Sequence, residues 1–194
     1  MISLNQLVSM HLRDGLMELL VKMEREDRSL PTIGPVKASL LYLIVSIVKP
    51  SRILELGTLH GYSALVMLKA CLDLGLKPRL ITVERDPSRA ARALKNFKRA
   101  GVEPLVQLVI DDAIRYLMRL NGIKFDLAFI DINKNQYPAA YKLCLPIIRK
   151  GGIMIFDNAL MPSVERFSKE IMRDTQVIAV LVGISDGMLI CIKR

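Results

Sequence analysis

The sequence lacks tryptophan and has only two histidines and three cysteines among its 194 residues. The spacing of Cys71, Cys144 and Cys191 does not match a zinc site, and two histidines do not favour a histidine-based one. No apolar run reaches the ~18 residues of a membrane span, so a membrane partner is not expected. The first five residues lack a signal-peptide pattern. We therefore expect a cytoplasmic protein whose cysteines are reduced and buried.

Length and charge set two further limits. A chain of 194 residues with 52% hydrophobic residues predicts one domain with a sizeable core. The net charge of +9 is uneven, because residues 51–100 hold ten Lys and Arg against four Asp and Glu. That excess is compatible with an anionic partner, such as RNA or a phosphorylated substrate, and equally with a solvated surface.

The first 50 residues predict helices. Residues 4–23 place apolar side chains at helical spacing, with His11 packed on the same stripe, and the polar residues 24–29 end this helix. Residues 30–35 form a proline-rich loop, and residues 36–48 form a nearly all-apolar helix that stops before Pro50. We interpret residues 1–50 as a helical appendage to a core of residues 51–194. The broad apolar stripe from Leu4 to Met23 also predicts a homodimer held partly by this helix.

Strands and helices alternate after the appendage. The predicted strands are 52–56, 79–84, 105–110, 125–130 and 151–156, with helices at 62–74, 87–100, 112–121 and 137–149. This alternation predicts a mostly parallel sheet with helices on both faces. After a helix at 163–173, strands at 177–183 and 187–193 form an antiparallel hairpin. Seven strands in this arrangement suit the α/β class and, by analogy of fold, the Rossmann-like class I S-adenosylmethionine-dependent methyltransferases.

Residues 52–63 predict a buried strand, a glycine turn and a helix start. Gly57 and Gly61 let the backbone turn sharply and approach a ligand, and open α/β sheets bind nucleotides at this place. The pattern E-x-G-x-x-x-G matches neither a dinucleotide fingerprint nor a phosphate loop. Glu55 repels a pyrophosphate and suits an ammonium group, which S-adenosylmethionine carries without any phosphate. The alternative is a turn that binds no ligand.

Acids follow the next two strands. Glu84 ends the second strand, where an acid accepts hydrogen bonds from both ribose hydroxyls of a nucleoside. Asp86, which precedes Pro87, is assigned to the cap of the following helix. Asp111 and Asp112 follow the third strand. We expect one of them to cap the next helix and the other to face an adenine amine.

Strands four and five each end in an acid. These acids are Asp131 and Asp157, and Asn158 follows the second one. Two carboxylates and an amide oxygen are hard ligands that suit Mg²⁺, and also Mn²⁺ or Ca²⁺. The alternative is that the acids only cap loops. That alternative is favoured for either acid alone, but not for both together with Asn158 and Lys134 beside them.

Together these motifs resemble the cation-dependent O-methyltransferase family that includes catechol and caffeoyl-coenzyme A O-methyltransferases. The resemblance covers residues 30–194, with its motifs at residues 54–58, 61–63, 125–137, 151–158 and 186–187. It implies a divalent cation held by Asp131, Asp157 and Asn158, with Lys134 as the catalytic base beside Asp131. It also implies an S-adenosylmethionine site that comprises Glu55, Gly57, Gly61, Tyr62, Ser63, Glu84, Asp112, Ala113 and Asp131.

Two features depart from that family. Asp111 stands where relatives usually have glycine before an acid-alanine pair, which affects the expected adenine contact. Relatives also carry a longer insertion after the Asp-Asn pair, whereas residues 159–162 here lead directly into a helix. We therefore expect a more open acceptor pocket, and the acceptor preference of the family does not transfer to this chain.

The resemblance implies methyl transfer to a small acceptor with vicinal hydroxyls, whose two adjacent oxygens chelate a cation. The alternative acceptor is a hydroxylated uridine of transfer RNA, contacted by a basic stripe of Arg85, Arg89, Arg92 and Arg99. This stripe follows the second strand rather than the strands that carry the two metal-site acids, which favours the diol. A non-enzymatic binding module is disfavoured because the set of acids, amide and lysine is intact.

Overall fold

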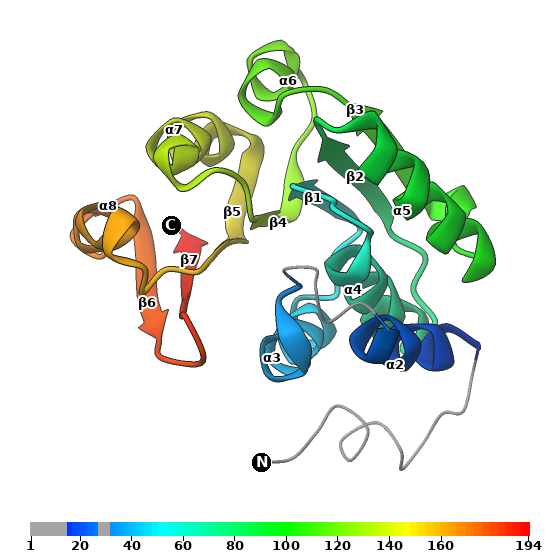
Figure 1. The fold of residues 1–194 in the computed structure, drawn as a ribbon. Coiled ribbons are helices and arrows are strands. Elements are labelled where there is room, and N and C mark those ends of the chain that lie inside the picture. Colours follow the sequence, from blue (N-terminus) through cyan, green and yellow to red (C-terminus); the bar gives the residue numbers. More distant parts are fainter. Residues whose placement is uncertain (1–14, 27–31) are drawn as a thin grey trace.

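Figure 1 shows the computed structural model, which describes residues 15–26 and 32–194. At its centre is a seven-stranded sheet with the order β3-β2-β1-β4-β5-β7-β6. β7 is antiparallel to its neighbours β5 and β6, and the other pairs are parallel. The strands are β1 (Arg52–Leu56), β2 (Arg79–Glu84), β3 (Val106–Ile110), β4 (Phe125–Ile130), β5 (Ile148–Asp157), β6 (Val177–Val182) and β7 (Met188–Lys193). The predicted α/β class and C-terminal hairpin are confirmed.

Helices cover both faces of the sheet (Figure 1). One face carries α2 (Gly15–Glu26), α3 (Gly34–Val48), α4 (Tyr62–Leu72) and α5 (Pro87–Arg99), and the other carries α6 (Ala113–Arg119), α7 (Tyr137–Ile147) and α8 (Glu165–Ile171). Each face has its own apolar core, and the neighbouring β1 residues Ile53 and Leu54 belong to opposite cores. This alternation follows from the two-residue period of a strand.

The N-terminal helices form a second layer over α4. Leu20 of α2 and Leu41 of α3 share one buried core with Leu65 of α4. Because α4 is covered by the sheet on one side and by these helices on the other, all its residues from Tyr62 to Cys71 are buried. This burial explains why the sequence of α4 is apolar on every side. Among the described residues, no helix has the length and apolar character needed to cross a membrane.

The predicted elements are confirmed, with shifts at their ends. The helix predicted at 137–149 ends at Ile147, because Ile148 pairs with Phe125 and so begins β5. The helix predicted at 4–23 is described only from Gly15, continues to Glu26, and leaves His11 outside the described residues. Three short 3₁₀ helices connect other elements: η1 (Glu103–Leu105), η2 (Lys134–Gln136) and η3 (Pro162–Val164). All three cysteines are buried and free, as expected.

The turn between β1 and α4 depends on close contacts that only glycine allows. Gly61 has a φ of 84°, and a Cβ on it would lie 2.5 Å from the ring of Phe97 on α5. Gly57 has a φ of 96°, and a Cβ there would lie 2.1 Å from the carbonyl oxygen of Asp131. The two glycines therefore bring α5 and the end of β4 against the end of β1.

Gly61→Ala should destabilise the fold more than Gly75→Ala does. Both positions have positive φ, but a Cβ on Gly75 meets nothing within 4 Å. We expect about 1–2 kcal/mol of lost stability at Gly75 from backbone strain, and a further loss of about 1–3 kcal/mol at Gly61 from overpacking against Phe97. Urea unfolding of the two variants measures the difference, and equal losses would contradict the packing argument.

One acid lies inside the sheet. Glu55 of β1 is fully buried and accepts hydrogen bonds from Ser63 Oγ at 2.6 Å and Thr82 Oγ1 at 2.5 Å. Burial raises the pKa of Glu55 to about 7, and the charges of Asp131 and Glu84 add to the rise while the two hydroxyls oppose it. An ionised Glu55 thus costs stability that a neutral side chain would not.

Glu55→Gln should flatten the pH dependence of stability. Because the folded-state pKa of Glu55 lies above its ordinary value of 4.5, its protonated form favours folding, and this contribution falls as pH rises from 4.5 to about 7. The free energy of unfolding of the variant, relative to that of the unaltered chain, should therefore rise by up to about 3 kcal/mol between pH 4 and pH 8. Urea unfolding across this range measures the gain. Glu103→Gln, at an exposed site, is the control, and a constant difference at Glu55 would contradict the prediction.

Candidate functional site

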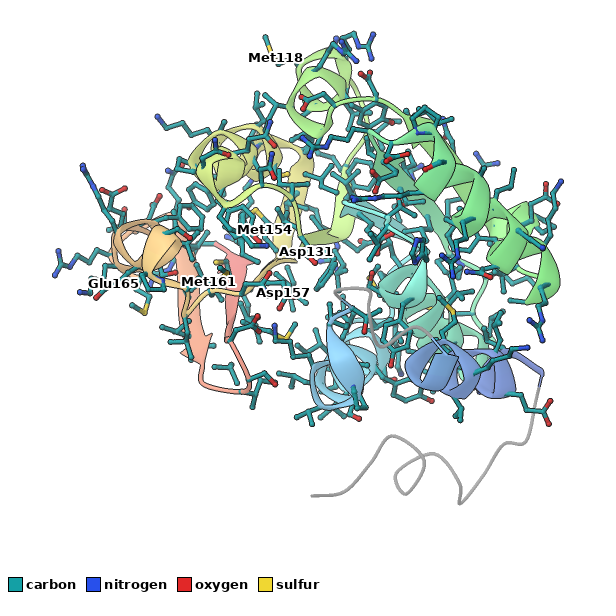
Figure 2. The ribbon with its side chains drawn as sticks, in the orientation of Figure 1. Met118, Asp131, Met154, Asp157, Met161 and Glu165 are labelled. Atoms are coloured by element: carbon teal, nitrogen blue, oxygen red, sulfur yellow. The ribbon has the colours of Figure 1, made fainter. Side chains whose placement is uncertain are left out.

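The predicted site residues meet at the carboxyl ends of the parallel strands. Two adjoining cavities of about 130 and 430 Å³ lie there, and both are lined by Gly57, Glu84 and Asp131. Asp157 and Asn158 line the larger one. Figure 2 shows Asp131 and Asp157 near each other, between the ends of β4 and β5 and helix α3. A separate cavity of about 360 Å³ at the opposite edge is lined by Arg52, Arg79 and mostly apolar residues, and no acid lines it.

Glu84 is held for hydrogen bonding toward both cavities. Its two carboxylate oxygens accept from the backbone N–H groups of Leu59 at 2.9 Å and Asp86 at 3.0 Å, and the side chain is buried. Each oxygen keeps a further lone pair that can accept a ligand hydroxyl. Asp86 caps α5 as predicted, since it accepts from the N–H groups of Ser88 and Arg89. The hydroxyl of Ser88, which also donates to Asp86, and then these two N–H groups lower the pKa of Asp86.

The two acids after β3 have different partners. Asp112 caps α6 by accepting from the N–H groups of Ile114 and Arg115, and these bonds lower its pKa. Asp111 is buried and pairs with Arg115 and Arg119. The cap, which the sequence left open between the two acids, is therefore Asp112. Asp111, Asp112 and Ala113 all line the smaller cavity. The expected contact of the other acid with an adenine amine therefore falls on Asp111, whose carboxylate is already paired with two arginines, and it stays a prediction. The cofactor contact of Asp112 that the family resemblance implies also stays a prediction.

Four predicted cofactor residues lie behind the lining of the cavities. Glu55, Gly61, Tyr62 and Ser63 do not line either cavity, and Ser63 uses its hydroxyl to hold Glu55. Tyr62 belongs to the core under α4. Direct contact of these four residues with a cofactor therefore stays a prediction, whereas the structure places Gly57, Glu84, Asp112, Ala113 and Asp131 at the cavities.

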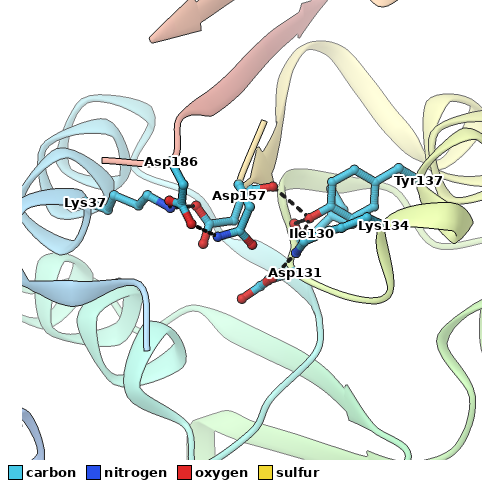
Figure 3. A network of polar contacts seen from close by, with 8 residues as sticks. Lys37, Ile130, Asp131, Lys134, Tyr137, Asp157 and Asp186 are labelled. Carbon is cyan, nitrogen blue, oxygen red and sulfur yellow. Dashed lines mark hydrogen bonds and ion pairs between the residues drawn. The ribbon is translucent and has the colours of Figure 1, made fainter. Parts of the chain in front are cut away.

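Lys134 lies beside Asp131 as predicted. Its Nζ donates to Asp131 Oδ1 at 2.6 Å and to Tyr137 Oη at 2.9 Å. Tyr137 in turn donates to the backbone carbonyl of Asp157 at 2.8 Å, so it links the ends of β4 and β5 (Figure 3). Burial, together with nearby carboxylates, raises the pKa of Tyr137 far above its ordinary value, so this tyrosine stays a neutral donor.

Asp157 is paired with a lysine from the N-terminal helices. Lys37 of α3 places its Nζ 2.5 Å from Asp157 Oδ1 and also contacts Asp186 (Figure 3). Burial, and then the charge of Asp131, raise the pKa of Asp157 to about 6, while Lys37 opposes the rise. Burial lowers the pKa of Lys37, but the two carboxylates outweigh burial and raise it overall. The side-chain amide of Asn158 donates to Asp186.

The donor set suits a hard divalent cation. Asp131, Asp157 and Asn158 offer two carboxylates and an amide carbonyl at one cavity, with Asp186 beside them. Burial and then the charge of Asp131 raise the pKa of Asp157, as expected for two carboxylates that face one cavity. Within residues 15–26 and 32–194, no cluster of three or more His, Cys, Asp and Glu side chains has the arrangement of a metal site. The predicted ligand set is not such a cluster, because its third ligand is the amide of Asn158.

Three residues of this site were not predicted from the sequence. Lys37 and Asp186 were not assigned to it, although Lys37 is the one charged residue within the apolar stretch 36–48. A buried lysine needs a counter-charge, so this pattern was a usable signal. The position of Arg89 is a correction, because Arg89 lines the larger cavity together with Asp131 and Asp157. The basic stripe therefore reaches the metal-site acids, since the start of α5 follows Glu84 directly at the same edge of the sheet.

Comparisons with known proteins point to one family. Residues 8–194 match the family described as O-methyltransferase. A catechol O-methyltransferase of Niastella koreensis is 37% identical over 132 residues, which cover 66% of this chain and 58% of the relative. One of Mycobacterium tuberculosis is 33% identical over 120 residues, covering 62% and 53%. The chain thus spans little more than half the length of these two relatives.

Solved structures extend the likeness to the whole fold. An O-methyltransferase of Bacillus cereus in complex with SAH has a TM-score of 0.82 and 26% identity, with 98% of this chain and 96% of that chain covered. An SAH-bound methyltransferase of Podospora anserina has a TM-score of 0.81 and 25% identity, with 94% and 89% covered. The chain therefore belongs to the O-methyltransferase family that includes the catechol and caffeoyl-CoA enzymes.

Proposed function

We propose that the chain is an S-adenosylmethionine-dependent O-methyltransferase that uses a divalent cation and methylates a small vicinal diol. The observation that carries this proposal is the position of Asp131, Lys134 and Asp157 in a cavity that adjoins Glu84. The SAH-bound relatives and the relatives named catechol O-methyltransferase support it. The cavity of about 430 Å³ is in the range that holds a small ligand.

The two cavities suit the two ends of the cofactor. Glu84 would accept the ribose hydroxyls, and Asp112 and Ala113 would adjoin the base in the smaller cavity. Gly57 lets the backbone come close to the ligand where the two cavities meet. The methionine end would lie beside Gly57 in the larger cavity, and a direct contact of its ammonium group with Glu55 would need the buried carboxylate to give up its bond to Ser63 or Thr82.

The chemistry follows from the charges of the reacting groups. A methyl group passes in line from a sulfonium to an oxygen, and a neutral phenol with a pKa near ~10 is a poor nucleophile. Asp131, Asp157 and Asn158 would hold the cation, most simply Mg²⁺ or else Mn²⁺ or Ca²⁺. When bound, it would lower the pKa of the acceptor hydroxyl and fix the orientation of its oxygen. Lys134 is ion-paired with Asp131 in this structure. A cation on Asp131 and the nearby sulfonium would disfavour the charged form of Lys134, and its neutral amine would then accept the hydroxyl proton. Asp131 and Tyr137 fix the position of its Nζ for this step.

A second candidate acceptor is a hydroxylated uridine of transfer RNA. One observation favours it, because Arg89 lines the larger cavity and thus would bring positive charge to the acceptor side, with Arg85 beside it at the smaller cavity. Arg92 and Arg99 continue this exposed surface along α5, while Ala90, Ala93 and Phe97 are buried under the helix. An RNA acceptor would use the same acids and Lys134 with a different docking surface.

The cofactor should bind without any divalent cation. Asp112 and Ala113 do not line the cavity that holds Asp157 and Asn158, and Glu84 is held by backbone N–H groups rather than by the metal-site residues. Titration calorimetry in excess chelator should show S-adenosylmethionine binding, weakened by about ten-fold or more in Glu84→Ala, because hydrogen bonds to a charged group are lost. Glu103→Ala, at an exposed site, is the control. Equal affinity in Glu84→Ala would remove Glu84 from the cofactor site.

The central test is methyl transfer from labelled cofactor to a panel of catechols and to bulk transfer RNA, with and without chelator. We expect transfer to a catechol that is abolished by chelator. Asp131→Ala and Asp157→Ala should reduce it by about 100-fold or more, because each removes an anionic ligand. Full activity in excess chelator would show that the cation has no part in the reaction.

The same assay separates the two acceptors. Arg92→Glu combined with Arg99→Glu changes the exposed stripe outside the cavities and should leave catechol methylation unchanged. If the acceptor is RNA, these reversals should weaken binding and flatten its salt dependence, by a slope of about 0.7–0.9 per lost phosphate contact. Methylation of transfer RNA that is lost in this variant would make RNA the acceptor.

A further inference from the structure

Lys37 is a buried cation at the oxygens that are assigned to the metal. Only 1% of Lys37 is exposed, and only 1% of Asp157. The Nζ atom of Lys37 lies 2.5 Å from Asp157 Oδ1 and also contacts Asp186. Figure 3 shows Lys37 reaching these acids from α3, on the side opposite to Lys134 and Tyr137.

The charges of the site are arranged as one pair and one group of three. Lys134 neutralises Asp131, and Lys37 is shared between Asp157 and Asp186. Asp186 is half-exposed, with 46% of its side chain accessible, whereas Asp157 depends on Lys37 for charge compensation inside the protein. A buried carboxylate without a partner is strongly unfavourable, so Lys37 performs in this structure the neutralising task of a bound cation.

We propose that Lys37 is a built-in competitor of the divalent cation for Asp157. This inference rests on the proposed function, because it takes Asp131, Asp157 and Asn158 as the ligands of that cation. An ammonium group at hydrogen-bonding distance from Asp157 Oδ1 takes up the oxygen lone pairs that a metal ion needs, and it repels the ion. Cation binding therefore requires the Lys37 ammonium group to withdraw from Asp157. Lys37 would then remain ion-paired with Asp186, which it already contacts.

The arrangement makes cation binding dependent on helix α3. Lys37 lies in the first turns of α3. Thr32, which precedes this helix, lines the larger cavity together with Asp157. Movement of the Lys37 side chain from Asp157 toward Asp186 thus alters contacts between the N-terminal helices and the β5 end of the sheet. Lys37 sets both the affinity for the cation and the stability of the cation-free protein.

The test is Mn²⁺ binding to the whole chain without cofactor, measured by titration calorimetry and by the electron paramagnetic resonance signal of free Mn²⁺. Lys37→Met keeps the length of the side chain and removes its charge. Its affinity for Mn²⁺ should be at least about ten-fold higher than that of the unaltered chain. Lys37→Arg keeps the charge and should bind Mn²⁺ as weakly as the unaltered chain. Lys142→Met, at an exposed position on α7, is the matched control.

Thermal unfolding provides a second readout. Without a divalent cation, Lys37→Met should unfold at a lower temperature than the unaltered chain, and Mn²⁺ should raise its midpoint more than it raises that of the unaltered chain. If the unaltered chain binds Mn²⁺ and Lys37→Met binds it equally or more weakly, the competition is wrong and the proposed function stands. If no form of the chain binds Mn²⁺, both the competition and the cation in the proposed function are wrong.

Discussion

Repulsion among carboxylates at one edge of the sheet is the constraint around which this structure is arranged. The parallel strands β2, β4 and β5 end at the same edge and bring Glu84, Asp131 and Asp157 to adjoining cavities. Each acid has a separate source of compensation: backbone N–H groups for Glu84, Lys134 for Asp131 and Lys37 for Asp157. Each of the three carboxylates is therefore compensated by groups of the chain itself.

The sheet order explains why the acids are so close. β1 lies between β2 and β4, so the turn after β1 runs past both Glu84 and Asp131. Ligands of open α/β sheets bind where the strand order reverses, and this turn lies at that point. Gly57 makes the arrangement possible, because any side chain there would collide with the Asp131 backbone. The same glycine thus serves packing and access to the ligand.

The larger cavity combines charges of both signs, because Arg89 lines it together with Asp131, Lys134 and Asp157. After Asn158 the chain passes through residues 159–162 directly into η3 and α8, and Asn158 itself has a φ of 53° that turns the chain sharply. Under the proposed function, an acceptor in this cavity would meet a basic group as well as the acids, and few side chains would decide which acceptor fits.

The sequence by itself determined the alternation of elements, the hairpin at the end and the acids at the ends of β2 to β5, because strand period, turn residues and strand ends are local patterns. It also identified Gly57, Glu84, Asp131, Asp157 and Lys134, since parallel strands place their ends at one edge. Only the tertiary structure decided that Asp112 rather than Asp111 caps α6, and that Arg89 reaches the cavity. It alone also paired Lys37 with Asp157, which is 120 residues away. Such contacts depend on how helices pack on the sheet and on where side chains point, and neither is encoded in local spacing.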